Sequence, residues 1–180
     1  MLIKLLKGFG CALRGIFYTL KNERHMRIHA VALVYVMFFS VFFNLSAEKY
    51  AILLLTGALV IVSEIINSAI ESVVDICKNE YSIIAKIAKD MAAGAVLISA
   101  IFSVIIAILF FNDISGYVNI LKFFLKYPIM LLFVGMFSIF SFIYITIGST
   151  EIKNRIKKFI TTLKHLKGGN LNGSSDNNKN

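Results

Sequence analysis

The chain has 180 residues, of which 58% are hydrophobic and 16% charged, and it contains a single proline. Together with a mean hydropathy of +0.78, this composition excludes a soluble domain and indicates an integral membrane protein too short for several domains. The formal charge of +9 is concentrated before the first apolar run and in the segment 153–167. Such basic segments suit the cytoplasmic face of a membrane, and nucleic-acid binding is a poor second interpretation.

Residues 1–28 predict an amphipathic helix that lies along the membrane surface. Apolar residues recur at spacings of three and four from Leu2 to Leu20, while Lys4 and Lys7 occupy other faces. A signal peptide would need an uninterrupted apolar core, and here the charges interrupt every run. We therefore expect an interfacial helix rather than a cleaved leader or a span.

Four apolar segments follow this helix. The predicted segments, in chain order, are a first span at 30–45, a second span at 51–62 continued by 63–75, a polar connection at 77–89, a third span at 91–111, a connection at 112–126 and a fourth span at 127–147. The first is short against the ~20 residues that a bilayer core needs, so its helix is expected to begin before Ala30.

The predicted fold is all-α. Its organisation is a surface helix at 1–28, a three-span core at 29–111, a connection with a fourth span at 112–150, and a basic segment with a polar tail at 151–180. Four crossings return the carboxyl terminus to the side of the amino terminus, which the basic segments predict to be cytoplasmic. The tail beyond Gly168 has the composition of a disordered segment.

The second apolar segment ends in polar residues that a span should not carry. Glu64, Asn67, Glu71 and Asp75 step by three, four and four, so they line one face of a helix, and we call them the acidic stripe. Charge in hydrocarbon costs several kcal/mol per residue, so the stripe must face protein or water. Asn67 alone would be interpreted as helix–helix glue, and Asp75 as a cap or salt-bridge partner. The stripe as a whole predicts an active site.

Three motifs carry a resemblance to a known family. The pattern E-x-x-N-x-A-I-E-x-x-x-D begins at Glu64, K-D-x-x-A-x-A-V begins at Lys89, and N-E-x-x-x-R begins at Asn22. Over residues 4–111 the chain resembles the prokaryotic integral-membrane diacylglycerol kinase and undecaprenol kinase family. The resemblance implies a three-helix lipid-kinase core that transfers a phosphoryl group from ATP, with Mg²⁺, to a membrane lipid.

The resemblance also assigns roles to residues of this sequence. It implies that Glu64 is the general base that takes the proton of the lipid hydroxyl. The implied ligands of Mg²⁺ are Glu23 and Glu71, and the implied ATP contacts are Glu80, Lys89, Asp90, Asn67 and Lys4. Hard oxygen ligands and a positive charge suit phosphoryl transfer, because the metal and the phosphates must be held while the hydroxyl attacks.

The lipid substrate is less closely defined by the resemblance. The implied lipid contacts are Arg27, His29 and Ala93, and the run Arg27-Ile28-His29 is more similar to undecaprenol kinases of Gram-positive bacteria than to diacylglycerol kinases. Undecaprenol is therefore favoured over diacylglycerol. A non-catalytic membrane module of the same fold is the alternative from another functional class, and it predicts the loss of one or more carboxylates. The motifs retain them all.

The resemblance implies an assembly and a location as well. It implies a homotrimer whose sites are shared between subunits, in the bacterial inner membrane, with the active site and both termini on the cytoplasmic side. The fourth span and the basic segment 151–180 have no counterpart in three-span members of the family.

Overall fold

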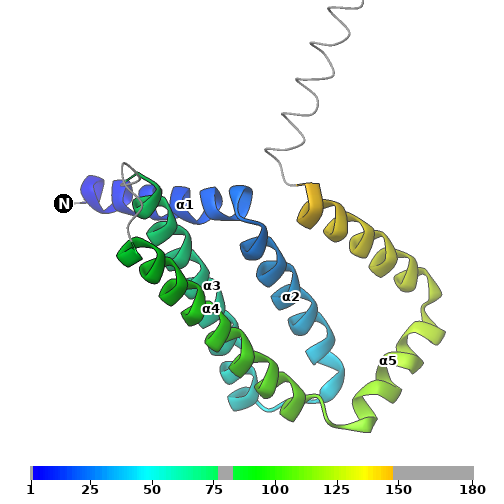
Figure 1. Cartoon of the computed structure of the whole chain (residues 1–180). Helices are drawn as coiled ribbons and strands as arrows, with labels where there is room; N and C mark the ends of the chain where they lie inside the picture. Colours follow the sequence, from blue (N-terminus) through cyan, green and yellow to red (C-terminus); the bar gives the residue numbers. More distant parts are fainter. Residues whose placement is uncertain (1, 77–82, 148–180) are drawn as a thin grey trace, which may run out of the picture.

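The computed structural model describes residues 2–76 and 83–147, and within these ranges all of its regular secondary structure is helical (Figure 1). The elements are α1 (Leu2–Asn22), α2 (Arg24–Ser40), the short 3-10 helix η1 (Val41–Phe43), α3 (Ala47–Ile76), α4 (Ile83–Phe110) and α5 (Ile114–Lys126). A further helix, Pro128–Ile147, follows α5, and we call it the fourth span. The all-α prediction is confirmed.

Four helical segments are long and apolar enough to cross a membrane. They are Arg24–Phe43, Ala47–Ile76, Ile83–Phe110 and Pro128–Ile147. Large apolar side chains on these segments point outward in the single chain, as the exposures of 61% for Leu55 and 65% for Ile108 illustrate. An aqueous surface would not tolerate this pattern, whereas lipid tails solvate it. The chain is an integral membrane protein.

The spans pack as antiparallel neighbours, with α3 and α4 side by side and α2 beside α3 (Figure 1). The hydroxyl oxygens of Ser63 on α3 and Ser99 on α4 lie 3.0 Å apart and link the two helices. Helix α1 lies across one end of the spans, which we call the α1 end. The opposite end, which carries η1 and α5, is called the α5 end.

A break at Glu23 separates the surface helix from the first span. Glu23 adopts an extended backbone conformation (φ −93°, ψ 124°) between α1 and α2, and the chain turns a corner there (Figure 1). The surface helix therefore ends earlier than the predicted limit of residue 28, so Arg27 and His29 belong to α2. The prediction that the first span begins before Ala30 is confirmed.

Both predicted connections contain helix. Because α4 begins at Ile83, Lys89 lies on a helix rather than in a polar connection. The segment 112–126, predicted as a connection, forms α5. Its start is fixed by Asp113, whose carboxylate accepts a hydrogen bond from the backbone N–H of Ser115 at 2.9 Å. Its buried Gly116 packs directly on the ring of Phe43, where any larger residue would collide.

Candidate active site

The acidic stripe forms a gradient of burial along α3. Glu64 is 2% exposed and Asn67 is 9% exposed, while Glu71 is half-buried and Asp75 is exposed. The neighbouring helices α1, α2 and α4 contact α3 and supply this cover. The prediction that the polar face of this helix meets protein rather than lipid is therefore confirmed for its two innermost members.

The length of α3 places the stripe at the edge of the hydrocarbon. Counting from Tyr50, the first residue after the charged pair Glu48-Lys49, Glu64 lies about 21 Å along the helix axis and Glu71 about 32 Å. The hydrocarbon core is ~30 Å thick. Glu64 thus lies at a depth that the polar head of an amphiphile reaches, and Glu71 lies where aqueous solutes begin to have access.

Asn67 lies between Glu64 and Glu71 in the stripe. Its Nδ2 donates a hydrogen bond to Oε1 of Glu71 at 3.2 Å. Its Oδ1 is buried and has no hydrogen-bond partner among the described residues. A buried amide oxygen without a partner is costly, so a ligand that supplies a donor or a cation at this point would relieve the cost.

The corner at Glu23 brings a carboxylate from another element to the stripe. The side chains of His25, Glu23 and Glu71 all interact electrostatically with the carboxyl group of Glu64. Glu23, at the corner, and Glu71, on α3, therefore both lie within electrostatic range of Glu64. The described residues hold no cluster of three or more His, Cys, Asp or Glu side chains arranged as a complete metal site. Two carboxylates nevertheless fit Mg²⁺, which is bound by one or two carboxylates together with waters and substrate phosphates.

Lys89 brings a positive charge to the same end of the bundle. Its Nζ lies 3.0 Å from Oδ1 of Asp75, in a salt bridge that joins the adjacent ends of α3 and α4. It also interacts electrostatically with Glu71. The interpretation of Asp75 as a salt-bridge partner is confirmed.

Arg27 does not face the stripe. Its guanidinium is buried, donates to the backbone oxygen of Lys21 at 3.0 Å and to that of Ile145 at 3.3 Å, and lies over the ring of Tyr144. Its contacts are thus with the end of α1 and with the fourth span. The sequence offered no signal for this, because 118 positions separate Arg27 from Ile145. Arg27 therefore joins helices in this structure, and its predicted contact with the lipid stays a prediction.

His29 has surroundings that suit its predicted role. It lines a groove of about 200 Å³ together with apolar residues of α2, α3 and α4. Lys4, Asp90 and Ala93 are exposed, and in the described part of the chain they make no side-chain hydrogen bond to the stripe. Glu80 lies outside the described residues.

Known proteins have sequences similar to that of the segment that carries this site. The sequence model of the family described as "Prokaryotic diacylglycerol kinase" matches residues 10–111. A diacylglycerol kinase of Synechocystis sp. is 44% identical over 103 residues, which cover 57% of this chain and 59% of that protein. An undecaprenol kinase of Bacillus subtilis is 37% identical over 60% of this chain and 88% of its own length. A diacylglycerol kinase of Escherichia coli K12 is 34% identical over 57% of this chain and 84% of its own length.

The matched segment contains the stripe, the corner and the whole of α4. It ends at residue 111, so α5 and the fourth span lie outside it. The chain spans less than two thirds of the length of the Synechocystis relative.

Proposed function

Because this chain belongs to the prokaryotic diacylglycerol kinase family of lipid kinases, we propose that it transfers the γ-phosphoryl group of ATP to the hydroxyl of a membrane lipid. The hydroxyl oxygen bonds to the γ-phosphorus while the bond from that phosphorus to the bridging oxygen breaks. The hydroxyl proton passes to Glu64, and ADP leaves. The buried carboxylate of Glu64, at the depth of a lipid head group, is the observation that carries the proposal.

Glu64 suits the role of the base for a geometric reason. It is the innermost acid of the stripe, and the other acids lie between it and the end of α3. A lipid hydroxyl enters from the membrane, whereas ATP enters from water, so the two reactants meet along this gradient. The side chain nearest the hydrocarbon is the one that can touch the hydroxyl.

Glu23 and Glu71 would hold the Mg²⁺ that accompanies ATP. The bound metal would neutralise phosphate charge. The hydrogen bond from Asn67 fixes the carboxylate of Glu71, and the unpartnered Oδ1 of Asn67 is a further oxygen directed into the site. Lys89 adds a positive charge for the phosphates. The predicted contacts of Lys4, Glu80 and Asp90 with the nucleotide stay predictions.

Undecaprenol is the lipid that we propose as substrate, with diacylglycerol as the alternative. The groove lined by His29 supports the binding of a hydrophobic lipid chain between α2, α3 and α4, because its other walls are mainly apolar. The relatives include kinases named for each lipid. Both lipids present a primary hydroxyl, so the same residues would serve either one.

The test is transfer of labelled phosphate from ATP by the purified full-length protein to undecaprenol and, in parallel, to diacylglycerol. Glu64→Gln should lower the rate by about 10²- to 10⁴-fold, since it removes the proton acceptor but keeps the side-chain shape. Exposed Glu48, at the opposite end of α3, provides the control Glu48→Gln, which should retain the rate. Absence of transfer to both lipids, or full activity of Glu64→Gln, would contradict the proposal.

A further inference from the structure

We propose that the fourth span positions Glu23, through a latch formed by Arg27, Tyr144 and the backbone oxygen of Ile145. The latch joins the end of the fourth span to the corner between α1 and α2. The inference rests on the proposed function in that it takes Glu23 as a metal ligand. It gives a role to a helix that lies outside the matched segment of the family.

The latch satisfies the backbone oxygens at the end of α1. A helix leaves its last carbonyl groups without partners inside the helix. Here the oxygen of Thr19 accepts from the N–H of Glu23 at 2.8 Å, and that of Leu20 accepts from the hydroxyl of Tyr144 at 3.2 Å. Arg27 donates to the oxygen of Lys21 at 3.0 Å. One of these three partners, Tyr144, comes from the fourth span.

Arg27 also contacts a second helix with the same guanidinium. Its other terminal nitrogen donates to the backbone oxygen of Ile145 in the fourth span at 3.3 Å. The carboxyl-terminal end of α1, with its partial negative charge, and a backbone oxygen of the fourth span therefore meet at one cation. The ring of Tyr144 covers this cation at 5.8 Å from its centroid. Arg27 is only 5% exposed, so water does not readily replace these contacts.

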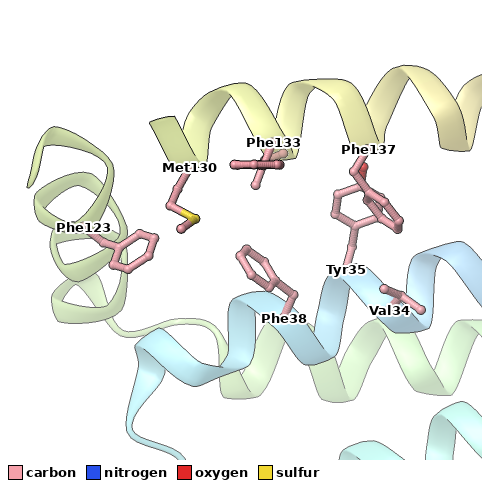
Figure 2. A pocket seen from close by; sticks show the side chains of 8 residues that line it. Val34, Tyr35, Phe38, Phe123, Met130, Phe133 and Phe137 are labelled. Atoms are coloured by element: carbon pink, nitrogen blue, oxygen red, sulfur yellow. The ribbon is translucent and has the colours of Figure 1, made fainter. Parts of the chain in front are cut away.

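Away from the latch, the interface between α2 and the fourth span combines a few contacts with a groove. Figure 2 shows a groove between the two helices, with side chains from both facing it and Phe123 of α5 at its end. The groove has a volume of about 350 Å³, and it is lined by Val34, Tyr35, Phe38, Phe123, Met130, Phe133, Val134 and Phe137. The hydroxyls of Tyr35 and Ser138 form the polar contact in this middle part, at 2.7 Å.

At the α5 end the fourth span is tied indirectly. Asn119 of α5 donates to the backbone oxygen of Phe42 at 3.1 Å, and the rings of Phe42 and Phe123 meet at 5.2 Å. Between this tie and the latch, the groove leaves the contact of Tyr35 with Ser138 and Phe137 to join the fourth span to α2. The latch is the contact that joins the fourth span to the corner itself.

Glu23 lies between the residues of α1 and α2 that the latch contacts. Its extended backbone is the hinge between α1 and α2, and the contacts on either side of it come from residues 19–21 and from Arg27. Loss of the latch would leave α1 free to change its angle at this hinge. The distance between Glu23 and Glu71 would then vary, although neither carboxylate had been altered.

The first measurement is the Mg²⁺ concentration that gives half-maximal lipid phosphorylation. Tyr144→Phe removes one hydroxyl, and Arg27→Lys keeps the charge but cannot bridge two carbonyl groups as a planar fork does. Each variant should raise this concentration by about three- to tenfold, which is the range for loss of one hydrogen bond, and leave the KM for the lipid within about twofold. Tyr35→Phe is the matched control, because it removes a hydroxyl from the same pair of helices away from the corner. It should leave the Mg²⁺ requirement unchanged.

The second measurement does not depend on activity. The measurement uses the full chain with the substitution Cys77→Ser. Nitroxide labels are attached to Cys11 on α1 and to a cysteine introduced on α3 by Leu59→Cys. Unlabelled protein is present in excess. Tyr144→Phe should broaden the distribution of distances between the labels, and Tyr35→Phe should not. The proposed role of the latch would be wrong if Tyr144→Phe and Arg27→Lys changed neither the distribution of distances nor the Mg²⁺ requirement. It would also be wrong if Tyr35→Phe had an equal effect. Absence of lipid phosphorylation by the unaltered protein would instead overturn the proposed function, while the distances would still test the latch.

Discussion

At the scale of single residues, the acidic stripe is divided by solvent access. Glu64 is buried, Asn67 is almost as buried, and Asp75 is exposed and paired with Lys89. Acids that are equivalent in a helical projection therefore have different tasks. Burial is expensive for a carboxylate, and it persists where function requires the group and the surrounding structure supplies stability. We therefore assign chemistry to the buried member and structural support to the exposed one.

The role of Asn67 can be tested against its neighbour Ser68. Asn67→Ala removes the donor to Glu71 and the unpartnered oxygen together. We expect the phosphorylation rate at limiting Mg²⁺ to fall by about 10- to 100-fold, as for other partners that orient a metal ligand. Excess Mg²⁺ should restore part of the rate.

Ser68→Ala is the control for this substitution. Ser68 is equally buried, but its hydroxyl bonds only to the backbone oxygen of Glu64 within the same helix. Its removal should change the rate by less than about twofold, as expected for a bond within one helix. Equal losses in the two variants would indicate a packing effect and would contradict the role of Asn67.

At the scale of elements, two short interruptions determine the path of the chain. Glu23 turns the chain from the surface helix into the first span, and Asp113 starts the helix that leads to the fourth. Asn44, with φ of 47°, ends η1 in the left-handed region that asparagine tolerates better than most residues. The carboxylate of Asp113 accepts a backbone hydrogen bond and Asn44 tolerates a positive φ, and an apolar residue would suit neither position.

The start of α5 should respond to acid. Hydrogen bonds from the side chain and the backbone of Ser115 lower the pKa of the Asp113 carboxyl below its usual value. A lowered pKa in the folded state means that the cap contributes its stability above the usual value of 3.8 and loses it as the pH falls through the lowered pKa. Amide exchange in the first turn of α5, corrected for the intrinsic effect of pH, should therefore quicken in that acidic window.

The same exchange measurement distinguishes the cap from other acid effects. At neutral pH, Asp113→Ala should quicken exchange in the first turn of α5 several-fold, since the cap is lost. Asp113→Ser retains an oxygen that can accept from the backbone and should keep most of the protection without the response to acid. Unchanged exchange in Asp113→Ala would show that α5 is held by Gly116 and its packing on Phe43 alone.

At the scale of the whole molecule, one chain leaves part of the predicted site uncovered. Asp90 and Ala93 on α4 are exposed, and large apolar side chains point outward from each span. Small bundles in lipid bury such surfaces by association. We propose, from the family resemblance, a homotrimer whose sites combine residues of neighbouring subunits.

Mixing two inactive variants tests whether sites are shared. Glu64→Gln and Lys89→Gln should each be inactive alone, because one lacks the base and the other a phosphate contact. Co-assembled from unfolded or detergent-separated subunits, they should regain a substantial fraction of activity if one subunit supplies Glu64 and its neighbour Lys89. If the mixture is no more active than the mean of the two variants measured separately, Glu64 and Lys89 of each site belong to one chain.

Local pattern was sufficient for much of the fold. The four spans, the surface helix and the face shared by Glu64, Asn67 and Glu71 follow from hydropathy and helical period. Helix α5 was missed because charged and polar residues divide the segment 112–126 into short apolar pieces. The limit of the surface helix was set too late because Glu23 interrupts it without a glycine or proline to mark the break.

The sequence by itself determined that this is a membrane-spanning chain with a carboxylate stripe, because side chains on one helix are placed by their spacing alone. The tertiary structure decided which residues join that stripe and which do not. Glu23 interacts electrostatically with Glu64 although 41 positions separate them, and Ile145 and Tyr144 contact Arg27 across 118 and 117 positions. Contacts at such separations depend on how whole helices pack, and no local pattern encodes that packing.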